Sequence, residues 1–488
     1  MELIESPVAA DRAGHVGLLA VLAAEAAQVD PGAVDAGWHQ AWDAVFPRAL
    51  RLLDDPDAAI RRSIVWAAGA SRFQSSTSAA SLKARFEREP DTDVRGDIID
   101  ALARLGEDDW VGALSGHADP SVSVPALLQT KTREASTVDP DQLARVLAAV
   151  TETSDWDLYA PVHGGSTPAL TASDKAAVAE ALADHPEPRR RTAAVRLANI
   201  LLAGNLDLDD RLVPLLAARV DDPETRSQAL EVLAAVAAPF PELYASRLDD
   251  RTPGRRSETV ADAALWALVR VGDVRCVPVL REQIAVGERH SRLHDATTHI
   301  WYLPSLGEML EQIPEAFVPE LLPAVRNKIS AGPHKARLDY LHALVAWGPR
   351  ASAARPEVEA LLGSEADFLA RQALDAVVPT TPEPPDPAEL AARDDWTRTR
   401  AAHRLWRATG DTAEAARVLI AVVEEVLDGP QALPVGRAAI TYLAEMGAAE
   451  AEPAARRILA ENRRLCYFGG WRVFTEDESW RRAARAIV

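Results

Sequence analysis

The sequence has little of what stabilises or anchors many other proteins. It contains two cysteines, Cys276 and Cys466, which lie far apart, so we expect neither a disulfide framework nor a CxxC metal site. Aromatic residues make up only 5% of the chain, and no segment shows the period-two alternation of a half-buried strand. No run of about 18 apolar residues occurs, which excludes a membrane-spanning helix of the usual kind. What remains is a chain rich in alanine and leucine, and we expect it to be all-α.

Basic residues are also outnumbered by acidic ones, 53 to 73. The formal net charge is −20 and the isoelectric point is about 5.1, so a nucleic-acid backbone or an anionic membrane is not an expected partner, whereas a basic protein or peptide is favoured. The opening residues, MELIESPVAADRAGHVG, lack the basic region and apolar core of a secretory signal, and we expect a cytoplasmic protein. Arginine greatly outnumbers lysine, a bias that suggests a bacterial source.

One sixteen-residue stretch, DVRGDIIDALARLGED at 93–108, shows how the chain is built. Val94, Ile98, Leu102 and Leu105 lie on a single stripe of a helix with 3.6 residues per turn. The acids before this stripe suit a helix N-terminus, and Gly106 stands where a left-handed C-cap requires glycine. Because no histidine or nucleophile accompanies the charges, we interpret them as caps and a solvated face and not as a catalytic cluster.

This pattern recurs along the chain, and other helices separate the copies. The motif recurs at 224–237 and, with a glycine at or next to the end, at 259–273, 334–348, 398–411 and 435–447, and degenerate copies occur at 55–71, 185–204 and 364–377. A pair of short amphipathic helices cannot bury both of its apolar faces alone, so neighbouring pairs must stack. We therefore predict an α-solenoid of antiparallel helix pairs, because 488 residues exceed what one ordinary compact core accommodates.

At this point the chain resembles the HEAT-repeat family, including the HEAT-like repeats of phycobilisome lyases. The resemblance is carried by the D-x-D-V-R start at Asp91–Arg95, the A-L-x-x-L-G end at Ala101–Gly106 and their copies, and covers about residues 40–462. It implies a fold more strongly than a function. Most members of the family are scaffolds and adaptors without a cofactor, and a minority are enzymes such as bilin lyases and alkylpurine DNA glycosylases.

Irregular segments divide the predicted stack. We expect capping helices within 1–54, repeats over 55–378 with inserts at 153–170 and 287–307, a proline-rich linker at 379–388, further repeats over 389–462 and a cap at 463–488. Long loops carry function more often than short ones, which makes the two inserts candidates for a pocket. Cys466, in the cap, is expected to be packed, although the neighbouring arginines offer an activated thiolate as the alternative.

Both inserts hold histidines. His290 and His294 are spaced i, i+4 and would share one helical face, which is a weak zinc candidate because no third ligand is apparent. His163 precedes a Gly-Gly pair near Asp155 and Asp157, but no established phosphate-binding or nucleophile motif accompanies it. We therefore assign no metal, cofactor or catalytic residue to the sequence.

A column of residues is the better candidate for a binding surface. The position of Asp100 points nearly opposite the apolar stripe of its helix, so the matching positions in the other copies should run along one outer surface of that helix layer. They are occupied by Trp66, Glu231, Trp266, His342, Asp375, Arg404 and Thr441. The resemblance to HEAT-like folds implies that this layer lines the concave side of the solenoid. Two tryptophans on a line expected to face solvent indicate a contact surface.

Three functions remain open from the sequence. The first is a non-catalytic scaffold or adaptor that binds a protein or peptide on its concave surface, or, more narrowly, an inhibitor or immunity protein for a basic toxin. The second is a lyase-like enzyme that acts on a cofactor or chromophore, with a pocket built from the inserts. The third is a glycosylase-like DNA-repair activity, which the acidic charge disfavours. The absence of a strong catalytic motif favours the scaffold.

Overall fold

The chain is helical throughout the residues described here. The structure is a computed structural model that describes residues 46–70, 75–152, 169–254, 259–286, 303–332, 334–378, 381–429 and 431–488. In these ranges it contains helices and turns and two isolated β-bridges, but no extended strand. Contacts between residues divide the chain into two compact units, residues 1–197 and residues 198–488, and the division falls inside helix α11, Pro188–Gly204. The proline-rich segment 379–388 lies within the second unit.

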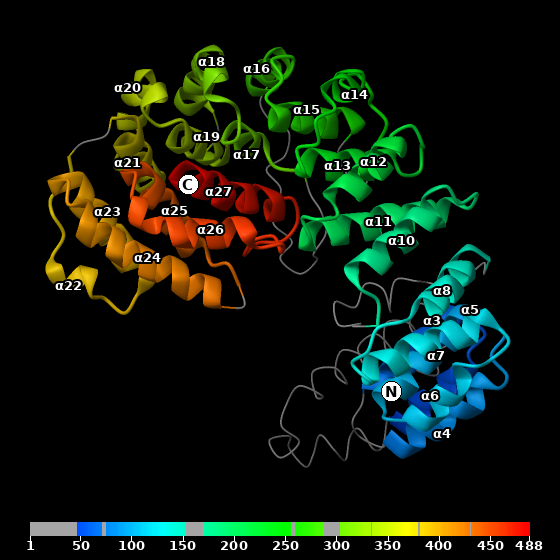
Figure 1. Cartoon of the computed structure of the whole chain (residues 1–488). Helices are drawn as coiled ribbons and strands as arrows, with labels where there is room; N and C mark the ends of the chain where they lie inside the picture. Colours follow the sequence, from blue (N-terminus) through cyan, green and yellow to red (C-terminus); the bar gives the residue numbers. More distant parts are fainter. Residues whose placement is uncertain are drawn as a thin grey trace. The chain divides into compact units, whose positions relative to one another are not determined.

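Unit 1 is a stack of antiparallel helix pairs (Figure 1). Its elements before α11 are η3 Leu50–Asp54, α3 Ala58–Ala70, α4 Ser75–Phe86, α5 Thr92–Arg104, α6 Asp108–Leu114, α7 Pro120–Arg133, α8 Pro140–Glu152 and α10 Ala172–Ala183. Helices α3, α5 and α7 pack side by side as one row, and α4 and α6 cover it. Each helix therefore contacts elements that are close to it in the sequence.

Helix α5 confirms the local pattern on which the solenoid prediction rests. Val94, Ile98 and Leu102 are fully buried, and each such side chain contributes about 1.5–3 kcal/mol through the removal of apolar surface from water. Asp91 is the N-cap, and its carboxylate accepts a hydrogen bond from the backbone N–H of Val94 at 3.0 Å. Gly106 has φ of +84°, so the helix ends in the left-handed conformation that the sequence predicts.

Unit 2 begins with two rows of helices. The outer row is α12 Asp209–Ala218, α14 Pro241–Ala245, α16 Cys276–Val286, α18 Val318–Ala331 and α20 Arg355–Glu359. The inner row is α13 Arg226–Ala235, α15 Val260–Val271, α17 Leu306–Leu310, α19 His334–Trp347 and α21 Asp367–Val377. Unit 2 also contains three short 3₁₀ helices: η4 Glu315–Phe317, η5 Gly348–Ala354 and η6 Ala449–Ala451. In Figure 1 the two rows run alongside each other, and within the inner row α13 packs against α15, α17 against α19 and α19 against α21.

The last third of unit 2 continues the pairing and then turns back. It consists of α22 Pro387–Leu390, α23 Asp395–Thr409, α24 Thr412–Asp428, α25 Pro434–Met446, α26 Glu452–Ala460 and α27 Arg472–Ile487. Helix α27 packs against α25 and α26 and also reaches α13 of the inner row. The residues from 463 to the end, here called the C-terminal segment, thus join the two ends of unit 2. The chain is an α-solenoid in which this unit is closed by its own last residues.

Close helix packing explains two of the glycines. A Cβ added to Gly307 of α17 would lie 2.6 Å from the Cβ of Asp339 on α19, and one added to Gly436 of α25 would lie 2.6 Å from the ring of Trp480 on α27. Only glycine permits helices to approach this closely without a backbone shift. The first of these contacts places α17 directly beside α19, and it thereby positions the candidate site.

Candidate functional site

The predicted column does not form one continuous exposed surface. In unit 1 Trp66 is 41% exposed, and Asp100 is half-buried, paired with Arg104 and hydrogen bonded to Gln129 at 2.7 Å. In unit 2 His342 and Arg404 are exposed, and Arg404 is paired with Glu389. The column residues of the two units belong to separate compact bodies.

The expectation that Trp266 faces solvent is wrong, because the side chain is 0% exposed. Its ring packs edge-on against Trp471 of the C-terminal segment, with 5.6 Å between ring centres, and the guanidinium of Arg270 lies 5.5 Å from its ring centre. The helical period gave no sign of this cover, since the covering residue lies about two hundred positions further along the chain. Trp266 is part of the core of unit 2.

Glu231 also departs from the expectation, since it is only 8% exposed. Its carboxylate accepts a hydrogen bond from the Ser227 hydroxyl at 3.1 Å, one turn earlier on α13. Helix α13 is among the elements that α27 contacts, and every residue of α13 from Gln228 to Ala235 is buried. The C-terminal segment therefore covers the inner row at Glu231 and Trp266, whereas Arg270 of α15, helix α17 and helix α19 border an open space.

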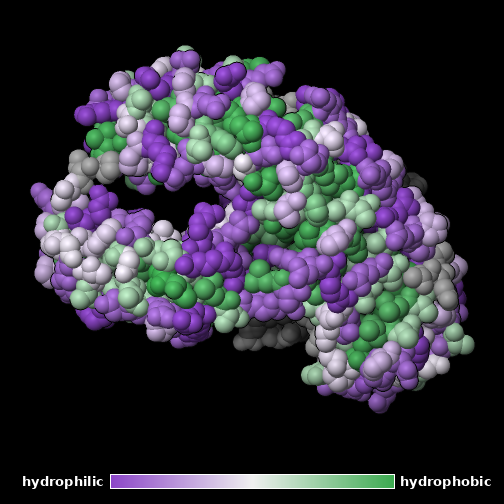
Figure 2. Space-filling model, turned by 45° about the horizontal axis from the view of Figure 1, so that its top comes forward, coloured by the Kyte–Doolittle hydropathy of each residue, from purple (hydrophilic) through white to green (hydrophobic). Residues whose placement is uncertain are grey.

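That open space is a pocket of about 950 Å³ within unit 2. One wall comes from the inner row: Arg270 of α15, Glu308 of α17, Glu311 just after it, and Asp339 and His342 of α19. The opposite wall comes from Arg437 of α25 and the C-terminal segment, chiefly Phe468, Trp471, Arg472 and Arg482. Figure 2 shows a hollow in this unit with many hydrophilic residues around it, which agrees with the charged lining of the pocket.

Ion pairs cross the pocket and hold its two walls together. Arg270, whose side chain is almost fully buried, is paired with Glu478 of α27, and Arg472 is paired with Glu308 of α17. On the second wall Arg437 pairs with Glu476 at 3.2 Å. These arginines are thus neutralised by carboxylates. Charged side chains line the pocket, but three of its four arginines are neutralised in this way.

Glu311 is the exception among the carboxylates of the pocket. Its carboxylate reaches solvent, yet this side chain forms no hydrogen bond or ion pair within the described part of the chain. The surrounding pocket walls limit its hydration and raise the pKa of its carboxyl to about 7, with a further increase from Glu308 and Asp339 and an opposing effect of Arg472. The fold therefore holds an unneutralised acid at an energetic cost, which is a common property of functional sites.

Aromatic side chains form the rim beside this acid. Tyr467 and Phe468 are 47% and 43% exposed and pack edge-on, with 5.0 Å between ring centres. The Arg472 guanidinium lies 5.5 Å from the centre of Phe468 and 5.4 Å from that of Trp471. Two large exposed aromatic residues beside a pocket are typical of a contact surface.

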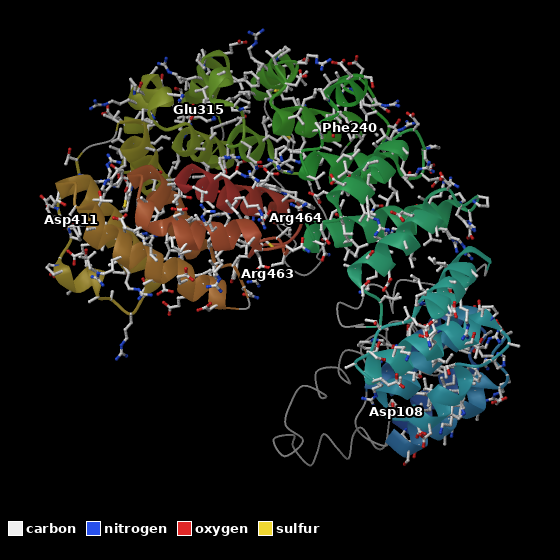
Figure 3. The ribbon with its side chains drawn as sticks, viewed as in Figure 1. Asp108, Phe240, Glu315, Asp411, Arg463 and Arg464 are labelled. Atoms are coloured by element: carbon white, nitrogen blue, oxygen red, sulfur yellow. The ribbon has the colours of Figure 1, made fainter. Side chains whose placement is uncertain are left out.

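The C-terminal segment is fixed by a network of buried charges. Arg464, whose side chain is 4% exposed, donates to the Leu202 carbonyl at 2.6 Å and to both carboxylate oxygens of Asp209 at 2.7 and 2.9 Å. Arg481 donates to both oxygens of Asp477 at 3.0 Å and to the carbonyl of Ile458 at 3.0 Å. Figure 3 shows Arg463 and Arg464 on this segment. The second wall of the pocket is thus a rigid part of the fold.

Cys466, in the same segment, does not fit the activated-thiolate alternative. It is half-buried, and burial raises its pKa, with additional increases from Glu476 and Asp477. The opposing effects of Arg464 and Arg463 are smaller, so the thiol is stabilised in its neutral form. This agrees with a packing role.

Several predicted features lie outside the described residues: the capping helices before residue 46, His163, His290 and His294, and most of both inserts. Among the residues that are described, no group of three or more potential ligands is arranged to hold a metal ion. Within the same residues, no helix is both long and apolar enough to cross a membrane.

Sequence reasoning missed Glu311 and placed residues 303–307 in an insert. The signal that would have found them is the stretch SLGE at 305–308. Ser305 caps α17 and accepts a hydrogen bond from the Glu308 N–H at 3.2 Å, while the Glu308 carboxylate accepts from the Ser305 N–H at 2.8 Å. This reciprocal capping box marks a helix start and places Glu311 at the end of that helix.

Comparison with known proteins finds structural similarity but no family. No family model and no curated protein matches the chain. Importin beta is similar in structure with 12% identity and a TM-score of 0.36, over 99% of this chain and 64% of that one. Kap121p bound to Pho4p is similar with 12% identity and a TM-score of 0.36, over 94% and 58%. An engineered protein is similar with 14% identity and a TM-score of 0.30, over 77% and 97%.

The chain spans about three fifths of the length of importin beta and of Kap121p. The TM-scores are low, so the solenoid assignment rests on the helix packing of this chain itself.

Proposed function

We propose that this HEAT-like solenoid is a non-catalytic scaffold that binds a protein or peptide partner in the pocket of unit 2. The observation that carries the proposal is the pocket of about 950 Å³ between α17, α19 and the C-terminal segment. Sites for small molecules are usually lined by apolar side chains with a few polar groups, whereas this lining is mainly charged. A charged lining with aromatic residues at its rim suits the main chain and polar side chains of a peptide.

The proposed site differs from the one that the column of residues predicted. The C-terminal segment already covers Trp266 and Glu231, so a partner cannot reach these two residues of the column. His342 is the column residue that lies in the pocket. We therefore place the partner at α17 and α19, on the same inner row but further along the stack.

The charge of the chain supports the choice of a basic partner. With a formal net charge of −20, the protein attracts cationic proteins and peptides and accelerates their encounter at low ionic strength. An inhibitor or immunity protein for a basic toxin is a narrower form of the same proposal, and the charge is the feature that favours it.

The test is a peptide selection on the immobilised full-length protein by display of random dodecapeptides. Ala346 is an exposed alanine of α19 that lines the pocket, so Ala346→Trp would fill the pocket without removing an ion pair. Ala80, an exposed alanine of α4 in unit 1, provides the matched Ala80→Trp control. We expect enriched peptides to bind the parent and Ala80→Trp but not Ala346→Trp. No enrichment, or equal binding to Ala346→Trp, would exclude the pocket as the site.

A further inference from the structure

The balance of charges in the pocket indicates what kind of side chain it receives. Three of its arginines, Arg270, Arg437 and Arg472, are already paired with carboxylates of the facing or same wall. Glu315 at the edge is paired with Arg350 of η5. Six carboxylates and four arginines line the pocket, so the lining as a whole carries an excess of negative charge. An anionic partner would meet this excess of acid.

Glu311 is the group on which this excess is concentrated. It follows α17 directly and points into the pocket from the inner row, with the carboxylates of Glu308 and Asp339 nearby. The Glu308 carboxylate is paired with Arg472, whereas the Glu311 carboxylate forms no ion pair or hydrogen bond in the described structure. A carboxylate in this position gains most from an incoming cation, because its own surroundings supply none at contact distance.

The rim provides the second half of a cation site. The exposed Phe468 ring lines the pocket with Arg472 near one side, and Tyr467 packs edge-on against it. Aromatic faces attract guanidinium and ammonium groups through the negative potential above the ring. The aliphatic stem of a long basic side chain also packs well on such rings. Glu311 and Phe468 thus contribute a carboxylate and an aromatic ring to facing walls of one pocket, and this combination suits an arginine or lysine side chain.

We infer that the pocket recognises a basic side chain, arginine or lysine, of a bound peptide segment, with Glu311 as its carboxylate partner and Phe468 as the ring against which its stem packs. This inference rests on the proposed function. An acidic side chain directed at Arg482, the lining arginine without an ion pair in the described residues, is the opposite arrangement, and the same experiment distinguishes the two.

The experiment is a double-mutant cycle between protein and peptide. A display-selected peptide is labelled with fluorescein, and its affinity is measured by fluorescence polarisation against the parent and Glu311→Gln. The same peptide with its basic residue replaced by glutamine is measured in parallel. On the parent we expect this replacement to weaken binding about 10-fold. On Glu311→Gln we expect the same replacement to change affinity by less than about 3-fold, since the two groups act as one pair.

Glu450 supplies the matched control. It is exposed on η6 and carries no ion pair in the described structure, so Glu450→Gln removes the same charge outside the pocket. Its peptide affinities should equal those of the parent. Phe468→Leu should weaken the arginine and lysine peptides and leave the glutamine peptide unchanged.

The experiments distinguish a failure of this inference from a failure of the proposed function. Selected peptides that require the open pocket but carry no basic residue, or that carry an acidic one, would overturn the inference and leave the scaffold proposal standing. So would an equal loss from the arginine-to-glutamine replacement on the parent and on Glu311→Gln. If no peptide is selected, or if Ala346→Trp binds as the parent does, the proposed function fails and the inference fails with it.

Discussion

A buried arginine holds each unit together, but the two arginines connect very different parts of the chain. In unit 1, Arg61 donates to both carboxylate oxygens of Glu89 at 3.0 and 2.8 Å, and the two residues are 28 positions apart. In unit 2, Arg464 binds Asp209, which is 255 positions away. Unit 1 is stabilised between neighbouring helices, as in an ordinary repeat array. Unit 2 is stabilised in addition by a contact between its first and last elements.

The largest effect should come from removing that contact. A chain that ends at Asn462 lacks the buried Phe474, Trp480 and the arginine network of the C-terminal segment. We expect the backbone amides of α13, α25 and α26 to lose protection from hydrogen exchange, because each of these helices packs against α27. The amides of α3, α5 and α7 should exchange as in the parent. Equal loss of protection in both units would show that they are not independent.

The two tryptophans of the predicted column provide the next comparison. Trp266→Ala removes a fully buried side chain and should cost about 3–5 kcal/mol of the free energy of unfolding. Trp66→Ala, at a side chain that is 41% exposed, should cost less than half as much. Chemical denaturation monitored by circular dichroism measures both. Trp266→Phe, which keeps a ring in the core, should lie between them, and similar losses for Trp66 and Trp266 would contradict the assignment of Trp266 to the core.

Removing only the Arg464 side chain, which makes the long-range contact, should have a somewhat smaller effect. Arg464→Ala removes the shared partner of Asp209, whose side chain is 37% exposed, and of buried Asp477, which keeps its pair with Arg481, and we expect a loss of about 2 kcal/mol. Arg62→Ala is the control in unit 1, where a half-exposed arginine pairs with Asp97 at 2.7 Å, and it should cost no more than about 1 kcal/mol. Thermal unfolding of the two variants tests whether the difference between the units lies in the burial of the pair.

The smallest effect concerns the stability of the pocket itself. Glu311 has its folded pKa raised to about 7, above the ordinary value of 4.5, so its ionisation opposes folding as the pH rises from 4.5 through 7. The charged or titratable groups that face it are Glu308, Asp339, His342 and Arg472. Glu311→Gln should therefore have a slightly higher melting temperature than the parent at pH 8 and the same melting temperature at pH 4. The gain in the free energy of unfolding at pH 8 should be below about 1 kcal/mol, because the group reaches solvent. A lower melting temperature at pH 8 would show that Glu311 is a stabilising residue.

Local structure could be predicted well because its causes are local. The glycine C-caps at Gly106, Gly272, Gly410 and Gly447 all have positive φ, as their position after an apolar stripe predicts. The buried stripe of α5 and its Asp91 cap follow from the same spacing. Stacking follows as well, since an amphipathic helix pair needs a neighbour.

The site could not be predicted in the same way. Trp266 lies opposite the apolar stripe of its helix, and residues on that side of an amphipathic helix usually face solvent. It is buried because Trp471, which follows a break in the repeat, returns to cover it. No periodicity encodes such a contact between distant segments. Glu311 lacks any pattern of its own, and only the preceding capping box at Ser305 indicates where it stands.

The link between Asp209 and Arg464 also affects how the protein is made. A repeat array acquires its contacts one after another as the chain is synthesised, and early helices become stable before later ones exist. Here the first helices of unit 2 must wait for their partner until more than 250 further residues have been translated. Contacts of such high sequence separation slow folding and prolong the exposure of apolar surface. We expect the nascent unit 2 to depend on protection from aggregation until the last residues leave the ribosome, whereas unit 1 completes its packing during synthesis.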